Sequence, residues 1–323
     1  MEKESKKVLL QTIGLKKYFK IGKNSYLHAV DDVNISINEG ETLGVVGESG
    51  CGKSTLGRTV LQLLPPTAGE VIFNGEKIDY RNRRQMDRLR TQMQIIFQDP
   101  YSSLNPRMSV MEIISQPLII NRVYKNKYEI FKRVDELMEI VGLAKRLRNV
   151  YPHELDGGRR QRIGVARALA LNPKFIVCDE PVSALDVSIQ AQILNLLMDL
   201  QDEYGLTYMF ITHDLSVVKH ISDWIAVMYL GQCVELTTSK EMFLNPIHPY
   251  TKALLSAIPV PDLSARQRKP EVIRGEVTNP IDPKPGCRFA KRCPFCTEEC
   301  TRDNIPLKEV SKDHFVACPR FSV

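Results

Sequence analysis

The sequence predicts an α/β protein with a phosphate-binding loop, an antiparallel β part, a helical part and a small Cys-rich C-terminal domain. Three observations support this fold class. An apolar run at residues 43–46 leads into a glycine-rich loop and then a helix-forming stretch. Two further apolar runs end in polar side chains, at Asp179 and at His213. Several cysteines crowd the chain after residue 286.

The length and composition indicate a globular protein with one large and one small domain. The chain has 323 residues, of which 43% are hydrophobic and 25% charged, which is ordinary for soluble proteins. No apolar run reaches the ~18 residues that cross a bilayer, and the start lacks a signal-peptide core. We therefore expect a cytosolic protein whose membrane role, if any, comes through partners. The net charge of +6 is spread along the chain and favours a solvated basic face over nucleic-acid binding.

The phosphate-binding loop is the strongest motif. Residues 47–55 match G-x-x-x-x-G-K-S between a buried strand and a helix, which is the context this loop requires. Glycines let backbone N–H groups face an anion, and the helix adds the positive end of its dipole. Lys53 is placed to reach the β and γ phosphates, and the Ser54 hydroxyl to ligate Mg²⁺. The loop consists of Gly47, Glu48, Ser49, Gly50, Cys51, Gly52, Lys53, Ser54 and Thr55.

The residues on either side of this loop read as strands. Residues 8–13 and 30–37 form apolar runs, and residues 69–75 predict a hairpin strand. Tyr18 and Phe19 lie upstream of the loop, where an aromatic ring could stack on a nucleotide base. From the residues alone, simple packing of a strand is the favoured interpretation.

A helical insert is expected at about residues 99–170. It follows a strand at 93–97 that ends at Gln98, and residues 101–148 carry apolar positions at three- and four-residue steps. A glycine pair, Gly157 and Gly158, then opens a helix and is a second potential anion site.

Two carboxylates follow the buried run at residues 175–178. One of the pair, Asp179 and Glu180, could hold Mg²⁺ and the other could polarise a water. A helix is predicted at 187–204 and a strand at 207–212. His213 follows that strand on the side where α/β sheets bind ligands. Residues 224–230 and 232–236 read as the two final strands.

The composition changes after residue 245. A short helix reaches residue 258, a polar, proline-containing linker runs to about 279, and the cysteine cluster follows. We therefore expect one domain at residues 1–258 and a C-terminal extension at 259–323. Cysteine ligation suits either zinc or an iron–sulfur cluster, and the spacing matches neither common ferredoxin pattern.

Together these motifs resemble the ATP-binding-cassette (ABC) ATPases over roughly residues 8–240, in that family's order. The Leu-x-Gly-Gly segment at 155–158 separates the chain from GTPases and kinases. The stretches 245–251 and 286–294 resemble the ATPases of oligopeptide, dipeptide and nickel importers. The resemblance implies an ATPase that uses Mg²⁺ and powers import of oligopeptides or dipeptides. A nickel or other small-solute importer, or a soluble ABC ATPase outside transport, remains open.

The resemblance also implies roles for individual residues. Phe19, or less readily Tyr18, would stack on adenine, and residues 47–55 would bind the triphosphate. Gln98 would sense the metal and the attacking water, Asp179 would support Mg²⁺, and Glu180 would be the general base. His213 would contact the γ-phosphate. Contacts across an ATPase dimer would come from Leu155, Asp156, Gly157, Gly158, Arg159 and Asp186.

One departure from the family pattern stands out. The family has Ser and Gln where this chain has Asp156 and Arg159, and an ionised Asp would repel a γ-phosphate in a desolvated site. Either the variation is tolerated because Arg159 or a neighbour neutralises Asp156, or the chain works in an asymmetric heterodimer with one weaker ATP site.

The resemblance further implies partners and a cluster. The partners would be a second ABC ATPase subunit, two integral membrane permease subunits and an extracytoplasmic substrate-binding protein, with no nucleic acid. This places the chain at the cytoplasmic face of the cell membrane. It also favours a [4Fe–4S] cluster on Cys287, Cys293, Cys300 and Cys318 over Zn²⁺, with Cys296 as a spare.

Overall fold

The computed structural model describes residues 7–258 and 280–321, which form two compact units. The helical unit comprises residues 38–40 and 78–210. The sheet unit comprises residues 7–37, 41–77, 211–258 and 280–321. The predicted linker, up to residue 279, lies outside the described residues. No helix within 7–258 and 280–321 has the length and apolar character needed to cross a membrane.

The sheet unit contains the antiparallel β part that the sequence predicts. Its first sheet has the strand order β2-β1-β4-β5, and β1 pairs antiparallel with β4. Along β2, Val33, Ile35 and Ile37 are buried and alternate with exposed residues, which is the two-residue period of a strand with one buried face. The bounds are β1 Val8–Lys20, β2 Tyr26–Asn38, β4 Ala68–Phe73 and β5 Glu76–Lys77.

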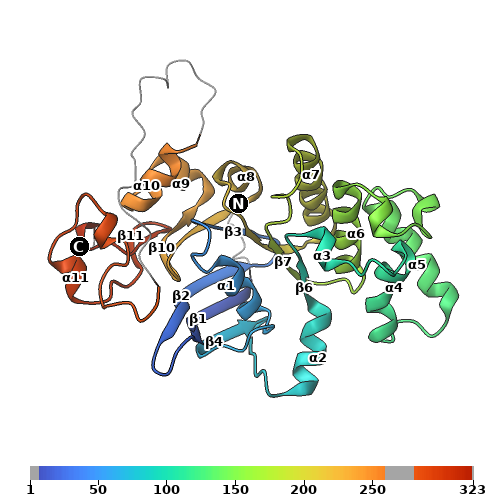
Figure 1. The fold of residues 1–323 in the computed structure, drawn as a ribbon, viewed down its shortest axis with the longest axis horizontal. Helices are drawn as coiled ribbons and strands as arrows, with labels where there is room; N and C mark the ends of the chain where they lie inside the picture. Colours follow the sequence, from blue (N-terminus) through green and yellow to red (C-terminus); the bar gives the residue numbers. More distant parts are fainter. Residues whose placement is uncertain (1–6, 259–279, 322–323) are drawn as a thin grey trace, which may run out of the picture. The chain divides into compact units, whose positions relative to one another are not determined.

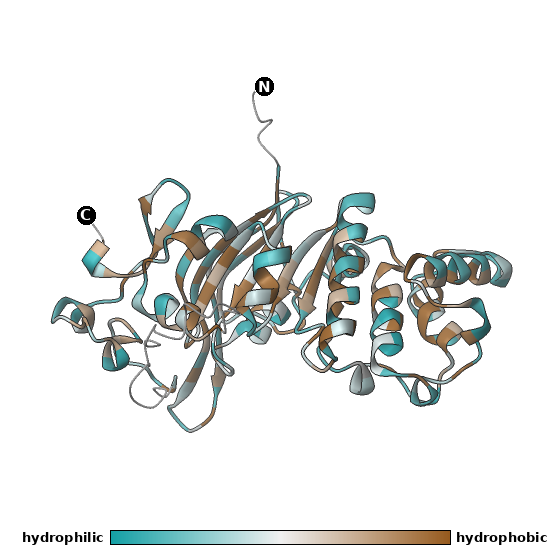
Figure 2. Cartoon of the chain, turned by 90° about the horizontal axis from the view of Figure 1, so that it is seen from above, coloured by the Kyte–Doolittle hydropathy of each residue, from teal (hydrophilic) through white to brown (hydrophobic). Residues whose placement is uncertain are grey.

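A second group of strands in this unit has the order β11-β12-β10-β9-β3. Figure 1 labels β11, β10 and β3 of this group. β3 (Thr42–Val46) is buried at every residue and runs parallel to β9 (Trp224–Tyr229), as its continuous apolar run predicts. Figure 2 shows hydrophobic residues along these central strands. The remaining strands are β10 Gln232–Thr238, β11 Lys308–Ser311 and β12 His314–Val316.

The helices of the sheet unit lie between or after its strands in the sequence. α1 (Lys53–Val60) has Gly52 as its N-cap, so the helix begins within the phosphate loop. Polar side chains cap three others: Asp214 caps α8 (Leu215–Ile221), Thr238 caps α9 (Ser239–Leu244) and His248 caps α10 (Pro249–Ser256). Near the C-terminus lie α11 (Glu299–Arg302) and the 3₁₀ turns Ala290–Arg292 and Pro319–Phe321.

The helical unit combines three strands with six α-helices. β6 pairs parallel with β7, and the order is β8-β7-β6. α4 begins with a capping box between Ser109 and Glu112. The bounds are β6 Met93–Ile96, β7 Phe175–Asp179, β8 Thr207–Ile211, α2 Arg83–Gln92, α3 Pro100–Ser103, α4 Val110–Ile120, α5 Lys127–Ile140, α6 Gly157–Leu169 and α7 Val187–Tyr204, with 3₁₀ turns Lys145–Leu147 and Pro152–Glu154.

The C-terminal region differs from the prediction in two ways. Strands β9 and β10 are not the last ones, because β11 and β12 follow. β12 pairs antiparallel with β10, with Leu236 opposite Phe315. Residues 280–321 therefore extend the sheet of the preceding region, and a separate Cys-rich domain is not supported. The pairing was hidden in the sequence because β12 spans only residues 314–316, too short to show an alternating pattern.

A buried polar cluster ties these strands to α10. The fully buried Glu235 carboxylate on β10 accepts N–H bonds from Ile247 (2.8 Å) and His248 (2.9 Å) and contacts His314 Nε2 on β12 (2.8 Å). His248 Nδ1 in turn accepts the Tyr250 N–H at 3.1 Å. Burial lowers the pKa of His248 to about 4, although nearby Glu235 opposes the shift.

This shift predicts acid sensitivity. The unfolded chain protonates His248 near pH 6.5, whereas the folded protein resists until about pH 4, so the unfolded state binds more protons between these values. The contribution of His248 to the free energy of unfolding is therefore fully present above about pH 6.5. It falls by about 3 kcal/mol as the pH drops to 4. His248→Asn retains a cap acceptor without titrating, so urea unfolding should show a shallower loss over this range. The exposed His220→Asn is the control, and an unchanged His248→Asn profile would refute the assignment.

Candidate functional site

The phosphate loop lies between β3 and α1 and depends on two glycines. Gly52 has φ 106°, and a Cβ there would lie 2.0 Å from the Ala29 carbonyl oxygen. A Cβ on Gly47 would lie 2.2 Å from the Met228 carbonyl oxygen. Neither position admits a side chain. Glycine is therefore required at both places for the backbone to curl as the motif predicts. With glycine at the N-cap, the first N–H groups of α1 face the loop without a side-chain cap.

Lys53 points back into this loop. Its side chain is 95% buried by the loop and its surroundings, and its Nζ donates to the carbonyls of Gly47 (2.8 Å) and Glu48 (2.9 Å). An ammonium group and a helix N-terminus thus occur at one place, which is a chemical arrangement suited to phosphate oxygens.

Residues from distant parts of the sheet unit hold the loop, and the sequence did not reveal them. The Tyr250 hydroxyl of α10 accepts the Glu48 N–H at 2.9 Å. The Gly231 N–H, in the turn between β9 and β10, donates to the Cys51 carbonyl at 2.7 Å. Arg292 pairs with the Glu48 carboxylate at 2.9 Å. Short-range patterns carry no signal for these contacts, because they join residues more than 150 positions apart.

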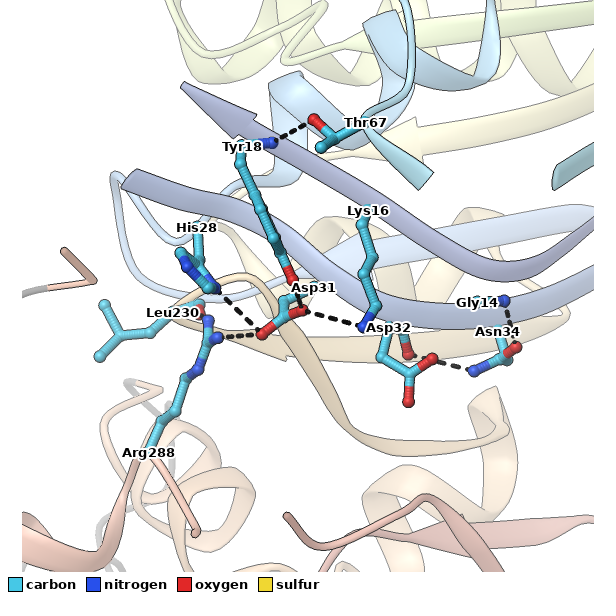
Figure 3. A network of polar contacts seen from close by, with 10 residues as sticks. All are labelled: Gly14, Lys16, Tyr18, His28, Asp31, Asp32, Asn34, Thr67, Leu230 and Arg288. Carbon is cyan, nitrogen blue, oxygen red and sulfur yellow. Dashed lines mark hydrogen bonds and ion pairs between the residues drawn. The ribbon is translucent and has the colours of Figure 1, made fainter. Parts of the chain in front are cut away.

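The two aromatic candidates for adenine stacking have different surroundings on β1. The Tyr18 ring stacks on His28 at 3.8 Å, and its hydroxyl donates to Asp31 (Figure 3). Burial raises the pKa of Tyr18, and the bond to Asp31 adds to the shift. Phe19 is half-buried and contacts the Lys17 ammonium at 5.1 Å. Tyr18 is therefore engaged on both its ring and its hydroxyl, whereas the Phe19 ring contacts a lysine side chain.

Arg288 from the C-terminal region joins the Tyr18 network. Its guanidinium pairs with Asp31 and also donates to the Leu230 carbonyl (Figure 3). Burial opposes ionisation of Asp31, yet the Tyr18 hydroxyl and the Arg288 charge together lower its pKa. Asp31 is therefore a carboxylate that joins the antiparallel sheet to residues near the C-terminus.

In the helical unit, the structure brings Gln98 and Glu180 together. Gln98 Nε2 donates to Glu180 Oε2 at 2.9 Å. Glu180 follows β7 with φ 47°, an unusual conformation for a residue with a side chain, and its carbonyl accepts the Ser183 N–H. Asp179, one residue earlier, is 1% exposed at the end of the strand. A buried and a more accessible carboxylate thus stand side by side in the sequence, with an amide orienting the second.

The segment at 155–159 forms the start of α6. Asp156 is the N-cap and accepts the Arg159 N–H at 2.8 Å, while the Arg159 guanidinium lies 3.4 Å from the other carboxylate oxygen. A Cβ on Gly158 would lie 2.7 Å from Ile189, which explains a glycine there. Leu155 is buried, and Asp186 is the N-cap of α7. The Arg159 and Asp156 side chains thus form an ion pair in which both partners are exposed.

His213 lies in the sheet unit, between β8 and α8. It is exposed, and its neighbour Asp214 caps α8 and donates its N–H to Thr212 Oγ1 at 3.0 Å. These bonds fix the turn that presents His213 at the strand end.

The C-terminal cysteines are near one another without forming a metal-ligand geometry. The Cys287 N–H donates to the Cys300 carbonyl at 2.7 Å, and burial raises the pKa of Cys287 to about 12, with Cys300, Cys293 and Cys318 contributing. Cys300 and Cys318 are buried, whereas Cys296 is exposed. Among residues 7–258 and 280–321, no three His, Cys, Asp or Glu side chains are arranged to hold a metal ion.

Comparisons with known proteins agree with this geometry. Residues 30–183 match the ABC transporter family model, and residues 234–300 match the model for the oligopeptide/dipeptide transporter C-terminal region. The oligopeptide transport ATP-binding protein OppF of Escherichia coli is 50% identical over 98% of this chain and 97% of its own length. AppF of Bacillus subtilis, of the same description, is 47% identical over 100% of both chains.

Solved structures show the same fold. The cbiO1 structure from Clostridium perfringens, part of the ABC transporter complex cbiONQ, has a TM-score of 0.66 at 31% identity and covers 74% of this chain and 92% of that chain. The ATP-binding cassette MJ0796, a dimer bound to ADP and phosphate, has a TM-score of 0.65 at 31% identity, over 72% and 99%. The chain therefore belongs to the ABC transporter family of ATPases, in the group that carries the oligopeptide/dipeptide transporter C-terminal region.

Proposed function

We propose that this ATPase powers the import of oligopeptides or dipeptides. The observation that carries the proposal is the full-length similarity to oligopeptide transport ATP-binding proteins, on a chain whose phosphate loop is complete. The match to the C-terminal region of peptide transporters favours peptides over nickel or another small solute. It also favours transport over a soluble ABC protein outside transport.

The residues have distinct roles in this proposal. The N–H groups of the loop and Lys53 bind the triphosphate, and Phe19 stacks on adenine. Glu180 accepts a proton from the attacking water, Gln98 orients that carboxylate, and His213 contacts the γ-phosphate. Mg²⁺ would neutralise phosphate charge when bound. Ser54 is the candidate ligand in the sheet unit, and Gln98 and Asp179 are the candidate ligands in the helical unit.

We further propose that the chain acts in an asymmetric ATPase dimer. Its partners are a second ABC ATPase, two permease subunits and an extracytoplasmic binding protein, at the cytoplasmic face of the membrane. Asp156 caps α6 by accepting the Arg159 N–H, and the Arg159 guanidinium lies 3.4 Å from the same carboxylate. The carboxylate nevertheless replaces a hydroxyl donor, which would weaken whichever ATP this segment contacts. Leu155, Gly157, Gly158 and Asp186 complete this dimer surface.

The function is tested by isolating the tagged full-length chain from its own membranes. We expect it to co-purify with integral membrane subunits, and the complex to hydrolyse ATP faster when peptide and binding protein are supplied. Stimulation by nickel rather than peptide would move the assignment to the small-solute importers. Recovery with ribosomes or DNA, and without membrane subunits, would refute a role in transport.

A [4Fe–4S] cluster on Cys287, Cys293, Cys300 and Cys318 remains a proposal. Its support is the donor chemistry of cysteine and the resemblance to peptide-importer ATPases. Within residues 7–258 and 280–321, no three donor side chains are arranged to hold a metal ion. Anaerobically purified protein should absorb visible light and release acid-labile sulfide, and the exposed Cys296→Ser should change neither. Colourless protein with stoichiometric zinc would establish the zinc alternative instead, and protein with neither would refute both.

A further inference from the structure

Arg292, in the C-terminal region, contacts the phosphate loop through a two-point ion pair. Its terminal nitrogens lie 2.9 and 3.2 Å from the two carboxylate oxygens of Glu48, the second residue of the loop. The Arg292 side chain is only 7% exposed and Glu48 28%. The guanidinium also donates to the Tyr229 hydroxyl at 3.3 Å. This is the geometry in which arginine holds a carboxylate most firmly.

A buried aromatic side chain, three residues before Arg292, anchors the backbone near the phosphate loop. Phe289, 2% exposed, packs edge-on against Tyr229, with ring centroids 5.3 Å apart, and at a tilt of 54° against Tyr250, with centroids 5.4 Å apart. The 3₁₀ turn Ala290–Arg292 follows, so the arginine side chain leaves the backbone one short turn beyond the anchor. Tyr250 is the residue that accepts the Glu48 N–H. The same aromatic group thus supports both the backbone and the side chain of Glu48.

The pair is poorly explained as a device for stability alone. Taking a guanidinium and a carboxylate out of water costs about as much as their attraction returns. In addition, the Arg292 Nε is buried with no hydrogen-bond partner in the part of the chain that the structure describes. These unfavourable contributions to the free energy of folding are explained if Arg292 has a function in the phosphate loop that it contacts.

The charge of Glu48 gives the reason. The loop must receive a polyanion, and a carboxylate on its second residue would repel that anion. The same carboxylate could also attract the Lys53 ammonium, whose Nζ already lies 2.9 Å from the Glu48 carbonyl. Arg292 neutralises the carboxylate and holds it by both oxygens, which leaves Lys53 available for phosphate.

We propose that Arg292 is a positioning residue for ATP binding: it holds and neutralises Glu48, so that the C-terminal region sets the nucleotide affinity of the phosphate loop. The inference rests on the assignment of residues 47–55 as the ATP-phosphate site. It gives the C-terminal region a direct part in nucleotide binding.

The test is a double-mutant cycle on the full-length chain, with the Kd for MgATP as the readout. Arg292→Ala should weaken binding about tenfold, because it leaves the Glu48 charge uncompensated. In a Glu48→Gln background, the same substitution should change the Kd by less than about twofold. Arg292→Lys should recover part of the loss, since it restores the charge but not the two-point contact.

Two further measurements separate positioning from damage to the fold. The control is Arg302→Ala, which breaks an exposed arginine–glutamate pair in the same region and should leave the Kd unchanged. In the assembled transporter, Arg292→Ala should raise the KM for ATP and leave kcat within about twofold. If Arg292→Ala is poorly folded, Arg292→Lys and the double variant decide.

Two results would overturn the inference while leaving the assignment of the ATP site intact. One is wild-type MgATP affinity in Arg292→Ala, and the other is an equal loss of affinity on Arg292→Ala in the wild-type and Glu48→Gln backgrounds. Failure of the wild-type chain to bind MgATP would overturn the assignment of the loop itself.

Discussion

Replacing Glu180 with glutamine should lower ATP hydrolysis by about 100- to 10,000-fold and leave MgATP binding within about threefold. The amide matches the carboxylate in size and can still meet Gln98, but it cannot accept a proton from water. Loss of the proposed general base should therefore slow the chemical step and spare the binding of the nucleotide. Phosphate release and equilibrium binding, measured on the same preparation, check the two parts.

The local geometry indicates that Glu180→Gln leaves the backbone conformation unchanged. Glu180 follows β7 with a positive φ, and its carbonyl accepts the Ser183 N–H, so the backbone position does not depend on the side-chain charge. The matched control is Glu203→Gln, an exposed residue on α7, which should keep full activity. Activity of Glu180→Gln within a few fold of wild type would show that another group accepts the proton.

The same variant tests the proposed asymmetry in the reconstituted ATPase pair. If Asp156 and Arg159 weaken one of the two ATP sites, the stronger site is the other one. That site would combine this chain's Lys53 and Glu180 with the partner's segment that corresponds to residues 155–159. Glu180→Gln should then abolish most of the activity of the pair. Activity that survives Glu180→Gln, but is lost on the matching change in the partner, would contradict the assignment.

Local patterns predicted the parts of the structure that local physics determines. The strand–loop–helix unit at residues 42–60 was predictable because a buried strand, glycines and a helix start each leave a short-range signal. α7 matches its predicted bounds because its apolar period is sustained from residue 187 to 204. The short helix α2 was not predicted, since its charged sequence has few apolar positions to show a period.

The supports of the phosphate loop could not be predicted in this way. Arg292 and Glu48 are 244 positions apart, and the Tyr250–Glu48 contact spans 202. The sequence drew attention to Arg292 and Tyr250 only as members of stretches that resemble peptide-importer ATPases. The β12–β10 pairing and the Glu235 cluster in the same region are likewise long-range features with weak sequence patterns. The residues proposed to touch the nucleotide were thus easier to find than the residues that hold them.

Replacing Lys53 with alanine should weaken MgATP binding by about 100-fold, which matches the loss of one or two hydrogen bonds to a charged group. In the structure the ammonium is nearly buried and bonded to two carbonyls of its own loop, so it is already oriented before the nucleotide arrives. Preorganised charge is worth more than a mobile lysine, because less freedom is lost on binding.

Lys53→Arg should not restore the affinity, since a planar guanidinium is larger than the space at a side chain only 5% exposed. Lys132→Ala, on the exposed face of α5, is the matched control and should bind MgATP normally. Tight binding by a folded Lys53→Ala variant would mean that the N–H groups of the loop hold the phosphates without the ammonium. The Arg292–Glu48 pair would then act on the loop backbone rather than by keeping Lys53 available.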